Sequence, residues 1–266
     1  MEFRPCIDIH NGRVKQIVGS SLKDQGSAAS ENFVSEQDGA FYAKLYREQG
    51  IRGGHVIMLN PVGSEHYEAT KMQALGALAA YPGGLQIGGG ITADNAKEFL
   101  DAGAAAVIVT SYVFRDGMID YENLKKLADA VGREHLVLDL SCRWKEVAGG
   151  EDGYYIVTDR WQNFTEERVT EELLDKLSAF CSEFLVHAVD VEGKANGIER
   201  PLVQLLGGWG KIPITYAGGV HSFYDLEQIA ELGNNRLNVT IGSALDLFGG
   251  PMSYREVIEY IKERRA

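Results

Sequence analysis

The stretch IGGGITADNAKEFLDAGAAAVIVTSYVF, residues 87–114, places a run of glycines after one apolar strand pattern and a serine turn after the next. Glycine weakens a strand end, so it is usually found there where the chain turns tightly or lets a ligand approach the backbone. A related stretch, YAGGVHSFYDLEQIAELGNNRLNVTIGSALDLF, occupies residues 216–248. At an offset of about 130 residues the two copies match: Gly89 and Gly90 fall on Gly218 and Gly219, and Ser111 falls on Ser243.

The same offset relates two further pairs of residues. The segment IDIHNGR matches LDLSCRW, with Asp8 on Asp139, and Asn60 falls on Asp190. These matches at nearly one period predict two half-barrels of four βα units each. A doubly wound sheet has no reason to show such a repeat.

Short apolar segments alternate with amphipathic helical patterns along the chain. Strands are predicted at residues 4–9, 55–59, 85–87, 106–110, 136–140, 184–190, 212–216 and 237–241. Helices are predicted within residues 39–50, 71–81, 94–103, 121–132, 170–180, 224–233 and 253–266, and several end at glycine, a frequent C-terminal cap. Eight such units predict an α/β protein of the (β/α)₈ TIM-barrel class. A doubly wound sheet is the alternative, because alternation alone does not prove closure.

Length and charge narrow the classes of function. At 266 residues the chain is long enough for one large core, and we expect a single (β/α)₈ barrel domain over residues 1–266 that acts as a monomer. The net charge of −12 disfavours binding to nucleic acid and to anionic membranes. No apolar run is long enough to span a membrane, and MEFRPCIDIH lacks the regions of a secretory leader, so we expect a cytoplasmic protein.

Each half of the repeat carries a Gly-Gly turn after its third strand and a serine turn after its fourth. In a barrel these turns are neighbours at the C-terminal face, where free backbone amides hold a phosphate without a cationic side chain. Two such sites predict a small-molecule substrate with a phosphate at each end. The alternative is that both glycine clusters are only tight turns between strand and helix.

Asp8 and Asp139 lie near the C-terminal end of the first strand in each half. Both follow apolar residues, and desolvation by a dry core raises the pKa of a carboxyl group. Two carboxyls facing each other across the barrel mouth predict a base and an acid that act on one bound sugar. Alternatively, each aspartate caps a helix or pairs with Arg13 or Arg143.

Seven segments together resemble the ProFAR isomerases of histidine biosynthesis, especially their eukaryotic-type branch: RPCIDIHNGRVKQIVG, GGHVIMLN, QIGGGIT, VLDLSCR, FLVHAVDVEG, YAGGV and IGSAL. The resemblance spans nearly the whole chain. It implies a (β/α)₈ barrel without cofactor that opens the ring of a phosphoribosyl aldose and rearranges it to the ketose, an Amadori rearrangement. It also implies that Asp8 is the general base for the sugar C2 proton and Asp139 the acid for ring opening. One phosphate would bind at Gly89, Gly90 and Ser111, and the other at Gly218, Gly219, Gly242 and Ser243.

The chain departs from the common bacterial pattern of that family after the sixth strand. A threonine follows the histidine there, whereas Ala188 follows His187 in this chain, so a hydroxyl contact to the sugar is absent or comes from another group. The insert from Trp144 to Thr165 predicts a mobile loop after the fifth strand. Trp161 within it resembles the family tryptophan that stacks on the aminoimidazole of the substrate, and the alternative is an anchor packed on the barrel rim.

Other chemistries have weaker support. His10, His55, His187 and Asp190 lie near strand ends, but they do not reproduce the two-His, two-Asp metal set of pentulose-phosphate epimerases, so we expect no metal. Cys142 has no visible partner base. Two other functions stay open: a related cyclase barrel, a lyase that receives ammonia from a glutaminase, and a non-catalytic phosphosugar-binding barrel.

Overall fold

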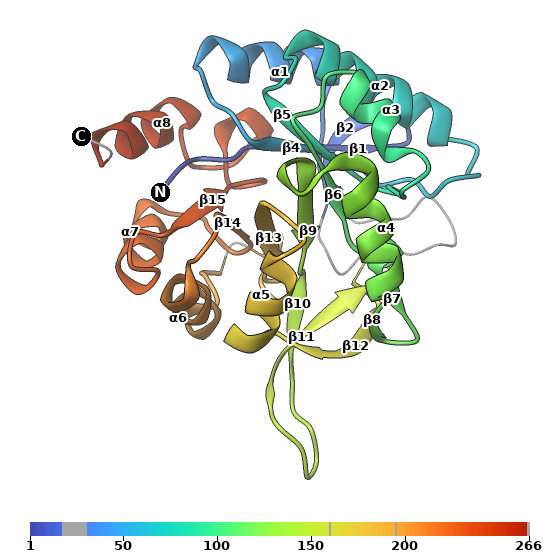
Figure 1. Ribbon diagram of the computed structural model, residues 1–266. Coiled ribbons are helices and arrows are strands. Elements are labelled where there is room, and N and C mark those ends of the chain that lie inside the picture. The colour runs from blue at the N-terminus through green and yellow to red at the C-terminus, as the bar shows by residue number, and fades with distance from the viewer. Residues whose placement is uncertain (18–30, 160, 195, 265–266) are drawn as a thin grey trace.

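Eight parallel strands form a closed barrel in the computed structural model, which describes residues 1–17, 31–159, 161–194 and 196–264 (Figure 1). In order around the barrel they are β1 (Cys6–His10), β4 (Gly54–Met58), β5 (Leu85–Gly88), β6 (Ala106–Val109), β9 (Leu136–Asp139), β13 (Glu183–His187), β14 (Ile214–Ala217) and β15 (Leu237–Thr240). The sheet closes where Phe3 bridges Val239 and the Val239 amide donates to the Glu2 carbonyl at 2.9 Å. The predicted TIM barrel is confirmed. The doubly wound alternative is wrong, because an open sheet would leave these two edges unpaired.

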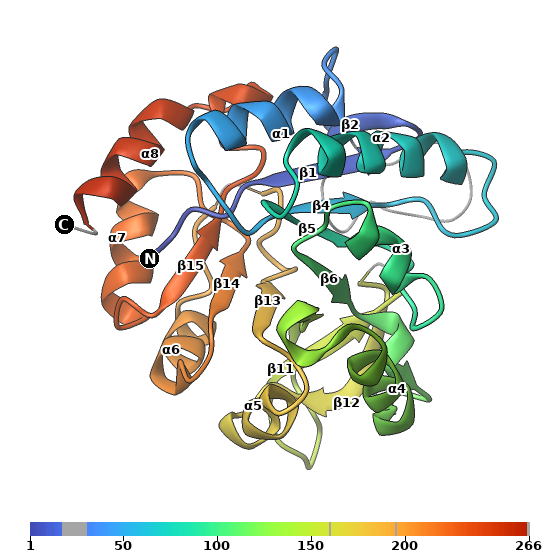
Figure 2. The same cartoon turned by 45° about the horizontal axis from the view of Figure 1, so that its top comes forward.

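Helices pack around the outside of the barrel, as Figures 1 and 2 show. They are α1 (Gly39–Glu48), α2 (Tyr67–Ala80), α3 (Ala96–Asp101), α4 (Tyr121–Val131), α5 (Glu171–Ser178), α6 (Arg200–Trp209), α7 (Phe223–Leu232) and α8 (Tyr254–Glu263). Only α6 was not predicted, because two glycines in its last turn obscure the helical pattern. The proline at its start was the available signal. Within the described residues no helix is long and apolar enough to cross a membrane.

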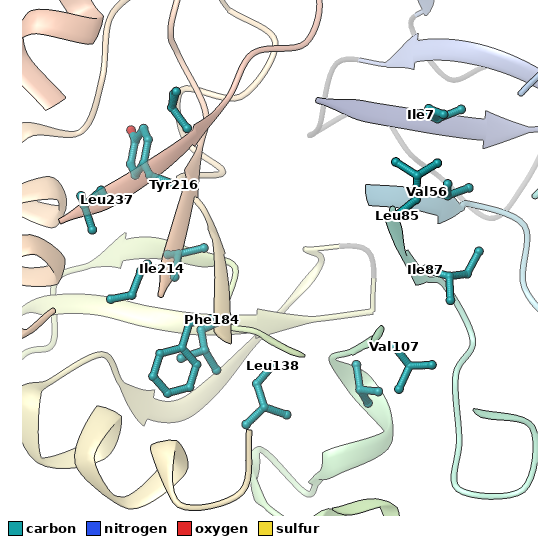
Figure 3. Close-up of a cluster of buried hydrophobic side chains, with 14 of the residues drawn as sticks. Ile7, Val56, Leu85, Ile87, Val107, Leu138, Phe184, Ile214, Tyr216 and Leu237 are labelled. Carbon is teal, nitrogen blue, oxygen red and sulfur yellow. The ribbon is translucent and has the colours of Figure 1, made fainter. Parts of the chain in front are cut away.

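The core has two layers, because successive side chains of a strand point to opposite faces of the sheet. The larger layer lies between strands and helices and includes Val107, Leu138 and Phe184, which Figure 3 shows among other buried side chains. A smaller cluster contains the alternate residues of the same strands: Ala106, Ile108, Val137 and Leu185. This cluster packs inside the barrel, beneath the ends of the strands that carry the candidate site.

An ion pair closes the N-terminal end of the barrel. Arg4 donates to the Glu183 carboxylate at 3.3 Å, and both side chains are largely buried. The same carboxylate accepts from Gln86 at 2.8 Å and from Thr215 at 2.6 Å. A buried ion pair needs such additional hydrogen bonds to offset its desolvation.

A hairpin that the sequence analysis did not predict extends β1. Strand β2 (Arg13–Ile17) pairs antiparallel with β1, and β3 (Glu31–Val34) pairs with β2. The turn consists of Asn11 and Gly12, with φ angles of 52° and 70°. Asn-Gly between strands is a strong hairpin signal, because both residues tolerate positive φ. The hairpin brings Gln16 next to Gly242 in the turn after β15, where a Cβ on that glycine would lie 2.5 Å from the Gln16 Oε1.

The insert after the fifth strand forms a small antiparallel sheet. Its strands are β10 (Cys142–Lys145), β11 (Gly153–Thr158) and β12 (Asn163–Arg168). The prediction of a loop over residues 144–165 is therefore wrong for half of this segment, which is in strands. The run YYIVT in β11 is rich in β-branched and aromatic residues, which favour strands. The turn between β10 and β11 projects away from the barrel (Figure 1), whereas the turn between β11 and β12 lies at the barrel mouth.

Candidate active site

A wide cavity of about 750 Å³ opens at the C-terminal ends of the barrel strands. Asp8 of β1 and Asp139 of β9 both line it. In the barrel order three strands separate β1 from β9 on either side, so the two carboxyls approach the cavity from opposite walls. This arrangement agrees with the predicted pair of carboxyls at the barrel mouth.

A narrow pocket of about 30 Å³ adjoins the wide cavity. Three of the described residues line both spaces: Asp8, His187 and Glu192. The first predicted phosphate set (Gly89, Gly90 and Ser111) lines the wide cavity, and the second (Gly218, Gly219, Gly242 and Ser243) lines the narrow pocket. The side chains of Asp8, His187 and Glu192 therefore lie between the predicted phosphate set of the first half of the repeat and that of the second half.

Backbone amides without partners lie in the turns of both predicted phosphate sets, among the described residues. In the described part of the chain, the amides of Gly90 and Ile91 make no hydrogen bond, nor do those of Gly219, Val220, Ser243 and Ala244. Among the described residues that line the two spaces there is no lysine or arginine. Free amides at a turn can donate to an anion without the help of a cationic side chain.

The glycines themselves have a structural reason that is independent of any ligand. Gly89 and Gly218 have φ angles of 100° and 119°, which disfavour other residues. A Cβ on Gly89 would lie 2.0 Å from the Met58 carbonyl oxygen, and one on Gly218 would lie 2.8 Å from that of Ala188. These two glycines let one strand turn pass close to the neighbouring strand, so their presence alone does not identify a phosphate site. The free amides do.

Asp8 is partly exposed to the cavity, and its neighbours Ile7 and Ile9 on β1 are buried. Burial raises its pKa to about 7, Glu192 adds to the rise, and His187 opposes it. The alternative pairing with Arg13 is wrong: among the described residues no ion pair joins Arg13 to Asp8, and the Arg13 guanidinium donates to the Ser35 carbonyl at 3.0 Å. A carboxyl with this pKa is ionised in a large fraction of molecules at neutral pH and can both accept and return a proton.

Asp139 belongs to a small hydrogen-bonded group with Ser141 and His187. Its Oδ1 accepts from the Ser141 amide at 2.8 Å and from the Ser141 hydroxyl at 2.6 Å. The His187 Nδ1 lies 3.2 Å from that hydroxyl oxygen and 3.8 Å from the Asp139 Oδ1. Burial alone would raise the pKa of Asp139, but these neighbours hold it below its ordinary value. Arg143 is not its partner, because Arg143 pairs with Asp190.

His187 and His55 have opposite protonation tendencies. Burial alone would lower the pKa of His187, but Asp139 in particular holds it above its ordinary value. Burial, helped by the nearby His187, lowers the pKa of His55 to about 3, so His55 is neutral. The two rings meet edge to face with centroids 6.1 Å apart.

The candidate metal ligands and the candidate reactive thiol have other structural roles or are buried in the described residues. They contain no group of three or more His, Cys, Asp or Glu side chains placed to hold a metal ion. Asp190, one of the weaker metal candidates, instead accepts from Arg143 at 2.8 Å and from the Trp144 amide at 3.0 Å, which fastens the insert to the barrel. Cys142 is buried, and burial raises the pKa of its thiol well above its ordinary value, which disfavours a reactive thiolate.

Trp161 lies in the turn between β11 and β12 and lines the wide cavity. Its ring is 5.5 Å from the His187 ring at an angle of 45°. Next to it, the Asp159 amide donates to the Ser111 hydroxyl at 3.3 Å. The insert therefore contacts both a titratable side chain and one predicted phosphate turn. The indole is placed for contact with a ligand in the cavity, as well as for packing on the rim.

A family model described as histidine biosynthesis protein matches residues 2–250. The chain belongs to this family. Its members include proteins named 1-(5-phosphoribosyl)-5-((5-phosphoribosylamino)methylideneamino) imidazole-4-carboxamide isomerase, the ProFAR isomerases. A chloroplastic one from Medicago truncatula is 51% identical over 269 residues, covering 100% of this chain and 83% of that protein. One from Neurospora crassa is 46% identical over 261 residues, 97% of each chain, and one from Saccharomyces cerevisiae is 40% identical over 256 residues, 94% of this chain and 93% of that protein.

Two residues of this histidine biosynthesis barrel were missed as site candidates. Ser141 lies two positions after Asp139, where a short polar side chain can bond back to a preceding aspartate. Glu192 follows β13 by a few residues, and burial raises its pKa. An acidic residue just beyond a barrel strand was the available signal for Glu192. His187 was considered only as a metal ligand.

Proposed function

We propose that the protein is an aldose–ketose isomerase that converts ProFAR to its phosphoribulosyl ketose in histidine biosynthesis. One observation carries the proposal: two sets of turns with free amides, one in the wide cavity and one in the narrow pocket, flank the titratable side chains of Asp8, His187 and Glu192. A substrate with a phosphate at each end fits this arrangement, with one sugar held over the titratable group. The named isomerase activity of the relatives supports this function over the cyclase and over a non-catalytic binding protein.

In this proposal the two phosphates are held by amides rather than by cations. The turn around Gly90 and the hydroxyl of Ser111 bind one phosphate in the wide cavity. The turns around Gly219 and Ser243 bind the other in the narrow pocket, together with Gly218 and Gly242. Anchoring both ends fixes the sugar between Asp8 and Asp139 and removes the entropy cost of orienting it at the moment of reaction.

The rearrangement requires one acid step and one base step. The ring opens when its oxygen gains a proton and the C1–O bond breaks, which leaves a protonated Schiff base between C1 and the nitrogen. Asp8 then takes the C2 proton, and the electron pair forms the C1–C2 double bond of an enolamine. Return of a proton to C1, with loss of the C2 hydroxyl proton, gives the C2 ketone. Asp8 has a pKa near the working pH, which suits a group that accepts and returns protons.

The acid acts from the opposite wall of the cavity, where Asp139 and its partners lie. Trp161 covers this wall, and we propose that its indole stacks on the aminoimidazole once substrate is bound. No step in this scheme needs a metal or a cofactor.

The proposal is tested by incubating the purified protein with ProFAR and following product formation by absorbance. We expect conversion to the ketose without ammonia or glutamine. Ammonia-dependent breakdown of added ketose would identify a cyclase instead. Binding without conversion over hours would identify a phosphosugar-binding protein.

We further propose a monomeric, single-domain protein of the cytoplasm. The main support is that the barrel closes within one chain, since Phe3 and Val239 join its first and last strands. Light scattering of the purified protein tests the monomer, a single cooperative unfolding transition tests the single domain, and cell fractionation tests the location.

A further inference from the structure

We propose that Tyr154, on strand β11 of the insert, is a positioning residue for the phosphate site in the narrow pocket. Through Glu199 it holds the β13–α6 segment, residues 190–194 and 196–199, against the turn at Gly219 that lines this pocket. The inference goes beyond the proposed isomerase function but rests on its second phosphate site. Three observations carry it: the anchoring of the segment, its contact with the turn, and the direction of the peptide group that it holds.

The insert holds the β13–α6 segment at both ends. At the first end, Asp190 accepts from the Arg143 Nε at 2.8 Å and from the Trp144 amide at 3.0 Å. At the second end, the Tyr154 hydroxyl donates to the Glu199 carboxylate at 2.8 Å. Strands β10 and β11 of the insert therefore determine where this segment begins and where it ends.

The bond from Tyr154 is the better protected of these two anchors. The Tyr154 side chain is buried. Burial and the bond to Glu199 raise the pKa of its hydroxyl above the ordinary value, so Tyr154 keeps its proton and donates. The side chains of the Arg143–Asp190 pair are 39% and 31% exposed, and an ion pair open to solvent contributes little. We therefore expect the loss of the Tyr154 bond to matter more.

Glu199 is also tied to the strand that leads into the turn. Its amide donates to the Tyr216 hydroxyl at 2.9 Å. Tyr216 lies on β14, three residues before Gly219, and its side chain is fully buried. The backbone of Glu199 is thus held by the barrel and its carboxylate by the insert, so both bodies determine its position.

The β13–α6 segment contacts the phosphate turn directly. The Gly197 amide donates to the Gly219 carbonyl at 3.2 Å. A Cβ on Gly219 would lie 2.0 Å from the Gly197 carbonyl oxygen, so the two backbones are in close contact. Gly197 is only two residues before Glu199, so a displacement of Glu199 reaches this contact. Glu192 and Gly193 of the same segment line the narrow pocket themselves.

The bond from Gly197 also sets the direction of one free amide. The Gly219 carbonyl and the Val220 amide belong to one planar trans peptide group, so they point in opposite directions. Gly197 and the His221 Nδ1 lie on the carbonyl side, at 3.2 Å and 3.3 Å from the oxygen. Val220 lines the narrow pocket, and its amide has no partner in the part of the chain that the structure describes. Holding the carbonyl therefore keeps this amide directed at a bound anion.

The test is a titration of ¹⁵N-labelled protein with inorganic phosphate, followed by NMR of the backbone amides. The Gly219 and Val220 signals report on the narrow pocket, and the Gly90 and Ile91 signals report on the wide cavity in the same sample. We expect Tyr154→Phe to weaken phosphate binding in the narrow pocket by ~3- to 10-fold, because a hydrogen bond to a charged group is lost. Binding in the wide cavity should be unchanged.

Tyr155→Phe is the matched control. It removes a hydroxyl from the next residue of β11, which donates to the Glu151 carbonyl at 2.8 Å, and it should change neither site. Glu199→Gln keeps an oxygen that accepts from Tyr154 and should retain most of the phosphate affinity of the narrow pocket. Glu199→Ala should weaken it as Tyr154→Phe does. If Glu199 acted only through its negative charge, its removal would strengthen phosphate binding instead.

The outcomes separate this inference from the proposed function. Unchanged binding in the narrow pocket of Tyr154→Phe, equal weakening at both sites, or stronger binding in Glu199→Ala would each overturn the inference. So would a wild type whose Gly219 and Val220 signals do not respond to phosphate. With ProFAR, Tyr154→Phe should raise KM with kcat near the wild-type value, since it removes binding rather than chemistry. A wild type that does not convert ProFAR contradicts the proposed function, whereas the phosphate titration still decides the role of Tyr154.

Discussion

Replacing Asp8 by asparagine should stabilise the fold at neutral and alkaline pH while it removes turnover. Burial raises the pKa of Asp8 from 3.8 to about 7, so the folded protein ionises this group less readily than the unfolded chain does. A difference of about three pKa units, at roughly 1.4 kcal/mol each, corresponds to about 4 kcal/mol of unfolding free energy. Both states hold the neutral acid at low pH. The destabilisation therefore grows as the pH rises from 3.8 to about 7 and is complete above that range.

Urea unfolding followed by circular dichroism measures this effect. At a pH above the folded-state pKa of Asp8, we expect the unfolding free energy of Asp8→Asn to exceed that of the wild type by about 4 kcal/mol. This difference should shrink steadily as the pH is lowered toward the pKa of a free carboxyl group. Asp94→Asn is the matched control: its side chain is largely exposed, so its effect should be small at every pH. A variant no more stable than the wild type at alkaline pH would show that Asp8 is not desolvated, and the argument for a base poised near neutral pH would fail.

Three further predictions concern the phosphates, the barrel floor and metals. Removing either hydroxyl, by Ser111→Ala or Ser243→Ala, should raise KM while leaving the fold intact. A bisphosphate analogue should bind more tightly than either monophosphate, and equal binding of the bisphosphate and the monophosphates would contradict two phosphate sites. Glu183→Ala leaves Arg4 buried without its partner, so the unfolding free energy should fall by about 3–5 kcal/mol. KM should stay near the wild-type value, because the ion pair lies at the opposite end of the barrel from the cavity. A fall below about 1 kcal/mol would mean that the ion pair is not buried in solution. Turnover should be unaffected by a chelator, and activity that is lost with EDTA and restored by zinc or iron would point to metal-assisted proton transfer.

The fold was predictable because its signal is repeated. The copies around Gly89 and Gly218 indicated two halves of four βα units each. The alternation of strands and helices predicted the eight barrel strands and every α-helix except α6, but none of the strands outside the barrel. The strand ends were less accurate: β14 begins at Ile214 rather than Ile212. The insert was misjudged because its role was inferred from length and a glycine-rich turn, although the strand-forming residues of β11 were legible in the sequence.

The positions of the two aspartates at the cavity were predictable from the sequence, but the side chains that contact them were not. Asp8 and Asp139 were found from their position in the repeat, and each lines the cavity as expected. That Ser141 and His187 gather around Asp139 depends on the pairing of β9 with β13, which joins residues far apart in the chain. Sequence spacing gives no information about such a contact. The difference in pKa between the two aspartates follows from these contacts, so it was not predictable either.

The central claim is that Asp8 takes the C2 proton of a bound phosphoribosyl aldose. The most direct measurement is single-turnover conversion of ProFAR, and of ProFAR deuterated at C2, by the wild type and by Asp8→Asn. We predict ketose formation by the wild type with a C2 isotope effect, and a rate lower by at least ~10²- to 10⁴-fold in Asp8→Asn with substrate still bound. Near-normal conversion by Asp8→Asn with substrate bound would place the base on another residue, and no conversion by the wild type would contradict the isomerase itself.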